Sequence, residues 1–268
     1  MRPNSGFSRI PENTSNLLRL MPFSSDTLPP VPPILPVTAL EEQHHNETAL
    51  AAPIARPSLR AWTYPAPALV LGRAQHQLAL PTGEAGALPV VVRGAGGGVV
   101  LVGPWLLSLA ITLPADDARV AAVPVADSYR WLGEATVAAL AELGVPARAL
   151  PPAERVPAPA DLAWACFAGV AAWEVVAFDA TGRARKLVGF AQRRSRHGVL
   201  LAMGLLLTCC PWLRMTERMG LPADQALAQA AGMAAGTIDL AALGPAPIRG
   251  EAFLQRLWPH LQPMHGVD

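Results

Sequence analysis

The sequence predicts an α+β fold with a mixed, largely antiparallel sheet and packed helices. Runs of alternating or continuous apolar residues, typical of strands, follow one another closely along the chain. The turn-forming segment Asp179–Gly182 separates two such runs and indicates a hairpin. Segments with a helical pattern stand apart from the strands, and this combination is typical of the α+β class.

The expected helices begin at recognisable capping residues. Thr38 with Glu41 three residues later forms a capping box, Asp127 is a candidate cap, and Pro222 suits a first helical turn. The expected helices cover residues 38–52, 127–143, 222–233 and 250–261.

The expected strands are read from apolar periodicity and from the glycines that end them. Leu59–Tyr64 alternates at period 2, and Val90–Arg93 runs directly into a glycine-rich loop. The expected strands cover residues 59–64, 68–73, 89–93, 99–102, 105–113, 173–178, 185–192 and 198–208.

Composition limits the class of protein. The 268 residues are 51% hydrophobic and 15% charged with a net charge of +1, which predicts a globular chain without the basic stripe of a nucleic-acid-binding protein. Three cysteines cannot form a fully paired disulfide framework, so we expect a reducing, cytoplasmic location. The longest apolar run, residues 198–210, is too short to cross a bilayer as a helix, so we expect no membrane partner.

The chain divides into a tail and one domain. Asn, Ser and Pro dominate the N-terminal residues, and the proline-rich run Leu28–Pro36 cannot form a helix or a central strand. We therefore expect residues 1–37 to form a disordered or extended tail and residues 38–268 to form the folded domain.

Lys186 is the only lysine in the chain, against 20 arginines. An ammonium is a compact point charge on a flexible stem, whereas a guanidinium is a wide planar fork that cannot replace it at a carbonyl-sized site. Lys186 is therefore a candidate functional residue, with a surface lysine left by compositional bias as the alternative.

A glycine-rich loop follows Arg93. Backbone without Cβ atoms admits a ligand, and successive N–H groups can bind a phosphate or an acyl carbonyl. The loop is neither a P-loop nor a dinucleotide fingerprint, because no Gly-Lys-Ser/Thr follows it and a strand rather than a helix continues the chain. A tight β-turn is the other interpretation.

Cys166 lies in an apolar setting, where a lone cysteine is by default buried and inert. A nearby ammonium would favour the thiolate, but the sequence alone does not place Cys166 beside Lys186. Cys209 and Cys210 lack the spacing of zinc ligands, so we expect them in the core and expect no metal site.

Three ordered segments resemble the motifs of the lipoate–protein ligase and octanoyltransferase family, which shares its catalytic domain with biotin–protein ligases. They are Leu71–Gln75, Val92–Val100 and Lys186–Gln192, and the resemblance covers roughly residues 40–260. It implies that Lys186 holds an acyl carbonyl and that Arg93 with the glycine loop binds an acyl, phosphopantetheine or nucleotide group. The substrate-binding set that it implies is Arg73, Arg93, Gly96, Gly97, Gly98, Val99, Val100, Leu101, Gly189, Ala191 and Gln192.

This family contains two chemistries. Cys166-Phe167, with Glu174 eight residues after the cysteine, is similar to the cysteine segment of the cysteine-dependent octanoyltransferases, which take octanoyl from acyl-carrier protein as a thioester. The resemblance implies an acyltransferase with Cys166 and Lys186 as catalytic residues and no tightly bound cofactor. Its acceptors would be lipoyl domains of 2-oxoacid dehydrogenases or the glycine-cleavage H protein. The first alternative is a ligase that uses lipoate, ATP and Mg²⁺ through an acyl-adenylate.

The chain also departs from the family pattern. The family's usual Arg, Ser or Thr, His, Pro and second His are replaced by Val92, Ala95, Val102, Val170 and Met203. These losses leave open a catalytically lapsed homologue that binds acyl groups or lipoyl domains. Biotin attachment is least expected, because the basic adenylate loop typical of biotin ligases is missing.

Overall fold

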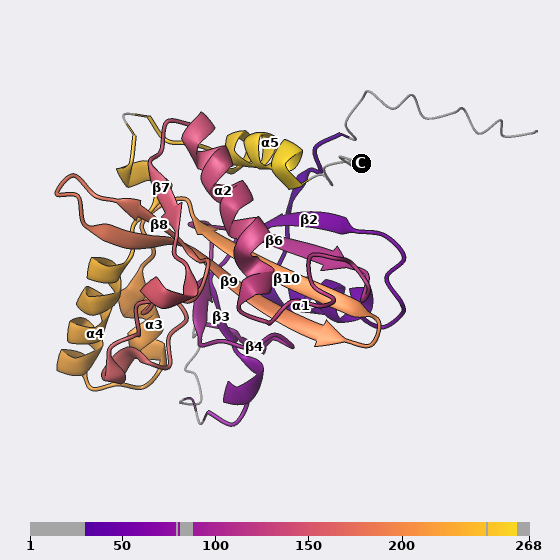
Figure 1. Ribbon diagram of the computed structural model, residues 1–268. Helices are drawn as coiled ribbons and strands as arrows, with labels where there is room; N and C mark the ends of the chain where they lie inside the picture. Colours follow the sequence, from indigo (N-terminus) through magenta and orange to yellow (C-terminus); the bar gives the residue numbers. More distant parts are fainter. Residues whose placement is uncertain (1–29, 79, 81–87, 245, 262–268) are drawn as a thin grey trace, which may run out of the picture. The chain divides into compact units, whose positions relative to one another are not determined.

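The computed structural model describes residues 30–78, 80, 88–244 and 246–261 (Figure 1). By internal contacts the chain divides into residues 1–30 and residues 31–268, and the second unit holds all the elements given below. Residues 1–29 of the predicted tail lie outside the described residues. No helix in the described ranges is long and apolar enough to cross a membrane.

Seven strands form the main sheet, in the order β1-β2-β6-β10-β9-β8-β7. All neighbours pair antiparallel except β1 and β2, which confirms the mixed, largely antiparallel sheet. The strands are β1 (Ile34–Pro36), β2 (Ser58–Thr63), β6 (Leu106–Leu113), β7 (Ala147–Ala149), β8 (Val175–Phe178), β9 (Ala184–Ser195) and β10 (Gly198–Leu206).

A smaller three-stranded sheet has the order β4-β3-β5, with β4 parallel and β5 antiparallel to β3. Its strands are β3 (Ala68–Leu71), β4 (Val90–Val92) and β5 (Val100–Val102). The glycine-rich loop connects β4 to β5, as the sequence predicts.

Within the described ranges, five α-helices pack around the sheets: α1 (Ala39–Ala49), α2 (Arg130–Glu142), α3 (Trp212–Arg218), α4 (Ala223–Gly236) and α5 (Gly250–Leu261). The predicted capping box at Thr38 and Glu41 is present, with the Thr38 N–H donating to Glu41 Oε2 at 2.7 Å. Asp127 does not cap α2. It starts a 3₁₀ turn before the helix, and its Oδ1 accepts the indole N–H of Trp173 at 3.3 Å.

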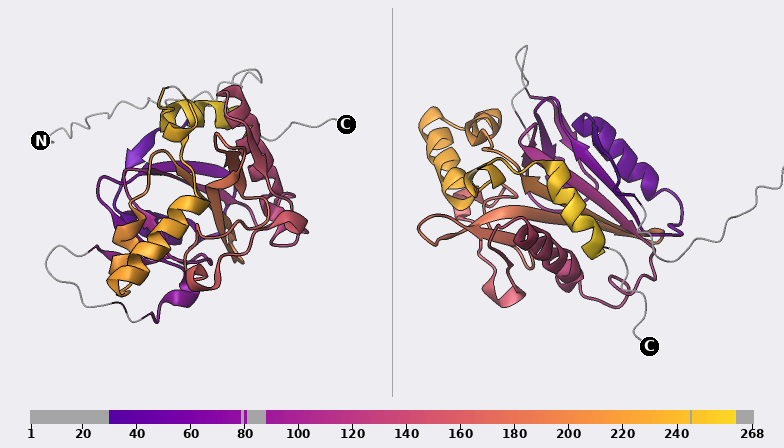
Figure 2. Two further views of the ribbon diagram at one scale, coloured as in Figure 1. Left: turned by 90° about the vertical axis from the view of Figure 1, so that its left-hand side faces the viewer. Right: turned by 90° about the horizontal axis from the view of Figure 1, so that it is seen from above.

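The two faces of the main sheet have different coverings. Leu201 and Leu205 of β10 belong to a core shared with α2 and α5. A second core contains Leu206, the strands β3 and β5, and residues of α3 and α4. Figure 2 (right) shows α1 on the opposite side of the sheet from α2 and α5. The alternation of side chains along β10 therefore leaves Leu200, Ala202 and Gly204 to face the α1 side.

Two strands and one helix were not predicted from the sequence. The strand β1 falls in the segment assigned to the tail, and it pairs only with β2 at the edge of the sheet. An edge strand tolerates proline because one row of its N–H groups is not needed for pairing. The strand β7 has only three residues, and α3 follows Pro211 at a point where the strand pattern of β10 has just ended.

Candidate active site

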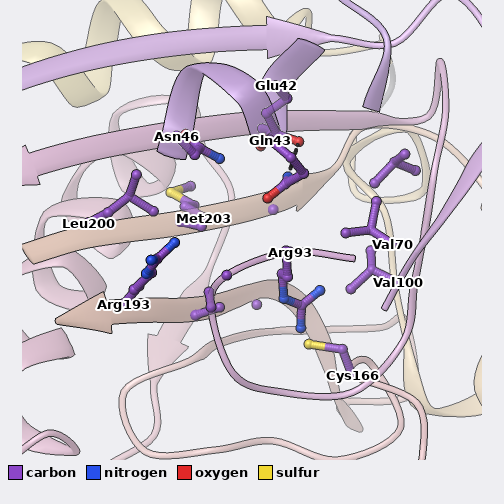
Figure 3. Close-up of a pocket in the computed structure, with 18 of the residues that line it drawn as sticks. Glu42, Gln43, Asn46, Val70, Arg93, Val100, Cys166, Arg193, Leu200 and Met203 are labelled. Carbon is purple, nitrogen blue, oxygen red and sulfur yellow. Dashed lines mark hydrogen bonds between the residues drawn. The ribbon is translucent and has the colours of Figure 1, made fainter. Parts of the chain in front are cut away.

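A pocket lies between α1, the glycine loop and the α1-facing side of β9 and β10 (Figure 3). Small-molecule sites are typically apolar clefts with a few well-placed polar groups, and this pocket has that character. Its apolar lining residues include Leu50, Val70, Val100, Val102, Leu106, Phe167 and Leu200. Phe190 and Met203 also border the pocket, although both belong to the core shared with α2 and α5.

Arg93 at one end of the pocket is buried, and its guanidinium shapes the glycine loop. Nε and Nη2 donate to the Gly96 carbonyl at 3.1 and 2.9 Å, and Nη2 also donates to the Gly98 carbonyl at 2.8 Å. Gly97 has a φ of 95°, which a residue with a side chain rarely adopts, and a Cβ there would lie 2.8 Å from Arg93 Nη2. Arg93 thus holds the loop in a conformation that needs glycine at position 97.

The resemblance motif Gly72–Gln75 joins the glycine loop to the cysteine segment. The Arg73 N–H donates to the Ala95 carbonyl at 3.0 Å, and a Cβ on Gly72 would overlap the Gly97 carbonyl oxygen. Gln75 Nε2 donates to the Trp164 carbonyl at 2.9 Å. The motif therefore has a positioning role through its backbone and Gln75, while the Arg73 side chain is exposed.

Cys166 is half-buried, lines the pocket and lies beside the glycine loop. A methyl group on Gly97 would lie 3.9 Å from Cys166 Sγ, and Figure 3 shows the sulfur turned toward Arg93. The Cys166 N–H donates to the Val99 carbonyl at 2.9 Å, which adds the cysteine segment to the start of β5. The structure thus brings together the cysteine and the loop that the sequence analysis selected separately.

Lys186 of β9 is 1% exposed, so it is no surface remnant. Its Nζ lies 2.6 Å from Glu174 Oε2 and donates to the carbonyls of Cys166 and Gly169 at 2.8 and 3.0 Å. An ammonium has three N–H donors, so these three partners engage all of them. The lysine is next to the cysteine segment, as required for a shared site, but it holds the main-chain oxygen of Cys166.

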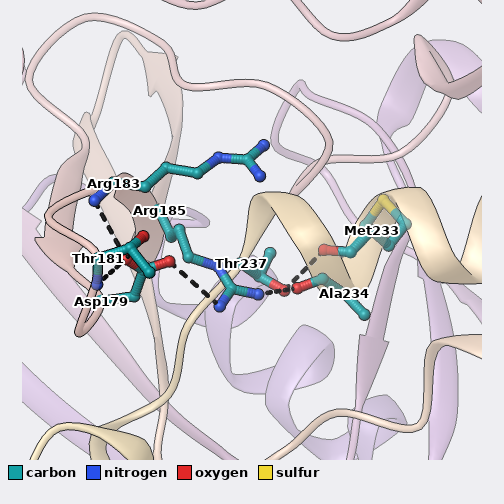
Figure 4. Close-up of polar contacts among 7 residues, drawn as sticks. All are labelled: Asp179, Thr181, Arg183, Arg185, Met233, Ala234 and Thr237. Carbon is teal, nitrogen blue, oxygen red and sulfur yellow. Dashed lines mark hydrogen bonds and ion pairs between the residues drawn. The ribbon is translucent and has the colours of Figure 1, made fainter.

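The hairpin that carries Lys186 is fixed at its tip (Figure 4). Asp179 accepts hydrogen bonds from Thr181 Oγ1 at 2.6 Å and from the N–H groups of Thr181 and Arg183 at 3.0 Å each. The Thr181 hydroxyl and these amides hold the pKa of Asp179 below its ordinary value. Arg185 lies 3.7 Å from Asp179 Oδ2 and donates to the Ala234 carbonyl at the end of α4.

The remaining predicted residues divide between pocket and scaffold. Val100, Gly189 and Ala191 line the pocket, whereas Val99 and Leu101 are each 1% exposed and lie in the apolar core. Gln192 Nε2 donates to the Val125 carbonyl and to Ser128 Oγ, both at 2.9 Å, so it fixes a neighbouring loop. Gly96 and Gly98 contribute the carbonyls that Arg93 binds.

The adjacent cysteines Cys209 and Cys210 do not both lie in the core. Cys210 is buried, and burial raises the pKa of its thiol. Cys209 is exposed, because β10 ends before it at Leu206. No group of three or more His, Cys, Asp and Glu side chains is arranged to hold a metal ion in the described ranges.

The sequence analysis missed a polar cluster on the α1 side of the pocket. Glu42 is 4% exposed and accepts hydrogen bonds from Tyr64 OH at 2.6 Å, Ser108 Oγ at 2.8 Å and Gln43 Nε2 at 3.1 Å. Burial raises the pKa of Glu42 above its ordinary value, an effect that the three donors oppose. Glu42 stands out only because it lies on the buried face of α1. The sequence pattern of the helix does not reveal that face, because the residues on both sides of Glu42 are also polar.

We expect Glu42 to make stability depend on pH. Its pKa is raised in the folded state, so its contribution to stability is complete below its unfolded value near 4.5 and is lost as the pH rises through the folded value. The variant Glu42→Gln cannot ionise, so its unfolding free energy relative to wild type should increase from pH 5 to pH 8 in urea titrations. The control variant Glu154→Gln, at an exposed position, should show no such increase. If the difference in unfolding free energy between Glu42→Gln and wild type is the same at both pH values, the prediction is wrong.

Two of the residues that line the pocket, Glu47 of α1 and Arg193 of β9, form an ion pair. A Cβ on Gly94 would overlap both charged groups, so glycine there lets the loop pass beneath them. Arg193 thus places a cation beside the loop in the lining of the pocket, and this residue was not selected from the sequence.

Comparisons with known proteins bear on the family and the fold of this chain. Residues 34–261 match the protein-family model described as the lipoyl protein ligase A/B catalytic domain. A search of curated protein sequences finds no significant match.

Three solved structures illustrate the similarity of fold. A bipartite lipoate protein ligase of Thermoplasma acidophilum, described with its E2 lipoyl domain, has a TM-score of 0.62 at 15% identity, covering 86% of this chain and 82% of that one. A putative lipoate protein ligase of T. acidophilum with bound lipoic acid has a TM-score of 0.56 at 15% identity, covering 85% and 82%. P. falciparum LipL1 in complex with lipoate has a TM-score of 0.53 at 12% identity, covering 85% and 61%.

The family match spans both sheets, every segment that lines the pocket, and Lys186, which holds the cysteine segment but does not itself line the pocket. The structural matches show the same fold. This chain therefore belongs to the lipoyl protein ligase A/B catalytic domain family, whose members are transferases and ligases.

Proposed function

We propose that this enzyme transfers an octanoyl or lipoyl group to a lysine of a lipoyl domain through a thioester on Cys166. One observation carries the proposal: the Cys166 side chain lines an apolar pocket beside the glycine loop. A ligase working through an acyl-adenylate needs no thiol at this point, whereas a transferase needs its nucleophile next to the acyl carbonyl.

The proposed reaction has two steps. The Cys166 thiol releases its proton and the thiolate attacks the carbonyl of an octanoyl thioester, so that a new C–S bond forms while the bond between the acyl carbon and the carrier sulfur breaks, and the carrier sulfur leaves with the released proton. The amine of the acceptor lysine then attacks the acyl-Cys166 carbonyl, an amide forms, and the proton released by the amine returns to the Cys166 sulfur. Thioesters react readily with amines, so no nucleotide is consumed.

The pocket supports the binding half of this proposal. An acyl chain would lie among the apolar side chains of β5, β6 and β10, with its carbonyl at the glycine loop. Backbone N–H groups in such loops can bind carbonyl or phosphate oxygens, which suits an acyl thioester or its phosphopantetheine arm. The three cysteines are free, and the thiol chemistry requires a reducing compartment such as the cytoplasm.

Lys186 has a different starting position from the one that the resemblance implies. Because its three donors are engaged, it can hold a substrate carbonyl only by exchanging one of its protein partners. In the described conformation it holds the segment that carries the nucleophile.

The related structures support the lipoyl domain among the proposed partners. The T. acidophilum ligase is described with its E2 lipoyl domain, and another T. acidophilum protein binds lipoic acid. We extend the lipoyl domain to this chain as the acceptor. The sequence resemblance adds the glycine-cleavage H protein as a second acceptor and octanoyl-acyl-carrier protein as the donor.

The test supplies two donors separately to the enzyme and a purified lipoyl domain. Intact mass spectrometry should show octanoylation of the domain with octanoyl-acyl-carrier protein and no ATP. Modification only with lipoate, ATP and Mg²⁺ would replace the proposal with a ligase. Modification with neither donor would replace it with a lapsed, binding homologue.

A further inference from the structure

Glu174 and Lys186 form a buried ion pair under the pocket. Their side chains are 3% and 1% exposed, and Lys186 Nζ lies 2.6 Å from Glu174 Oε2. Burying two charges costs desolvation free energy, and such pairs persist only with good geometry and additional hydrogen bonds. The additional bonds here show what the pair does.

The Glu174 carboxylate connects the cysteine segment to β9. Its Oε2 also accepts the Ala171 N–H at 2.6 Å, and its Oε1 accepts the Phe190 N–H at 3.0 Å. Phe190 lies on the wall of the pocket. One side chain therefore fixes the end of the segment that begins at Cys166.

The Lys186 ammonium fixes the beginning and middle of the same segment. It donates to the carbonyls of Cys166 and Gly169 at 2.8 and 3.0 Å. Its third donor is directed at Glu174, so the carboxylate both orients the ammonium and compensates its charge.

The backbone around the pair is arranged to permit it. Trp173, directly before Glu174, has a φ of 65° and is the one non-glycine residue with positive φ in the described ranges. Such conformations cost free energy and persist where the surrounding structure over-determines them. A Cβ on Gly189 would lie 3.3 Å from Lys186 Cε and 3.4 Å from Glu174 Oε1, so glycine leaves room for both side chains.

We propose that Glu174 is a positioning residue that acts through Lys186. Glu174 orients the Lys186 ammonium, which holds the Cys166 carbonyl and thereby keeps the thiol at the glycine loop. This inference rests on the proposed function only for its catalytic consequence. The contacts that fix residues 166–174 exist whichever reaction the enzyme performs.

The experiment compares Glu174→Gln, Lys186→Met and the double variant with wild type. Glutamine keeps the size of Glu174 but removes its charge and turns an N–H donor toward the ammonium. Glu154→Gln is the matched control, because Glu154 forms an ion pair of the same 2.6 Å length with Arg148 but is exposed. Backbone hydrogen exchange by mass spectrometry reports on residues 166–174, and single-turnover assays report acyl-Cys166 formation.

In Glu174→Gln, exchange in residues 166–174 should accelerate about 10-fold or more while peptides of α2 and α5 keep the wild-type rate. The maximal rate of acyl-Cys166 formation should fall about 100-fold, because a small misplacement of a nucleophile has effects of that order, while the donor concentration for half-maximal rate stays within about 3-fold. Adding Glu174→Gln to Lys186→Met should accelerate hydrogen exchange less than adding it to wild type, because the two residues act together. Glu154→Gln should change none of these.

Wild-type exchange in Glu174→Gln, or an acceleration of equal size in both backgrounds, would overturn the inference. So would wild-type adduct formation in Glu174→Gln. If Glu174→Gln does not fold, the double variant replaces it in the test, because it leaves no unpaired buried charge. Faster exchange in residues 166–174 than in wild type then supports the inference, and wild-type exchange overturns it. If wild type forms no adduct, the proposed function fails and exchange alone judges the positioning role.

Discussion

The variant Lys186→Arg is expected to lose about 3–5 kcal/mol of unfolding free energy and to lose transfer activity to background. The guanidinium is wider than the ammonium, and the slot between Glu174 and the carbonyls of Cys166 and Gly169 encloses a side chain that is 1% exposed. A guanidinium that cannot occupy this space leaves the Glu174 carboxylate buried without its partner. Urea unfolding and the donor assay measure the two losses.

The control for this prediction is Arg148→Lys, which makes the reverse exchange in an exposed ion pair. Exposed pairs contribute little, so this variant should remain within about 0.5 kcal/mol of wild type. Near-normal stability and turnover in Lys186→Arg would refute the assignment of Lys186 to the site.

The variant Cys166→Ser is expected to form no acyl adduct and to lower transfer by about 1,000-fold or more. A serine hydroxyl is a poor nucleophile without a neighbouring base, and none of the described residues that line the pocket is histidine. Wild type incubated with octanoyl-acyl-carrier protein alone should gain one acyl group on Cys166, and added lipoyl domain should remove it. Intact mass and peptide mapping detect both events.

Cys209→Ser is the matched control, because it makes the same chemical change at an exposed thiol. It should retain the adduct and full transfer. Full activity of Cys166→Ser with lipoate and ATP, together with no adduct on wild type, would assign the acyl-adenylate chemistry instead.

Local signals predicted much of the fold. The capping box at Thr38 and the turn at Asp179–Gly182 act between residues close in sequence, so α1 and the hairpin of β8 and β9 follow from them. The strand β1 could not be predicted in this way. Pro36 and the prolines just before the strand oppose strand formation locally, and pairing with the distant β2 stabilises it.

The candidate site was predictable in its segments but not in its contacts. The glycine loop, Cys166 and Lys186 were selected from residue type and motif order. The inward turn of the Arg93 guanidinium and the engagement of Lys186 by Glu174 depend on side-chain directions that a sequence pattern does not encode. Glu42 was missed because its burial depends on where α1 packs, not on the periodicity of the helix itself.

The burial of Lys186 also determines what this enzyme cannot modify. A protein that carries a reactive acyl thioester risks acylating its own exposed amines. Lys186 is the one side-chain amine in the sequence, and it is 1% exposed and bonded to three partners. The arginines that replace lysine elsewhere remain protonated and are poor acyl acceptors. The chain thus offers no exposed lysine to the proposed acyl-Cys166 intermediate, and an amine-directed label should leave Lys186 of the folded chain unmodified.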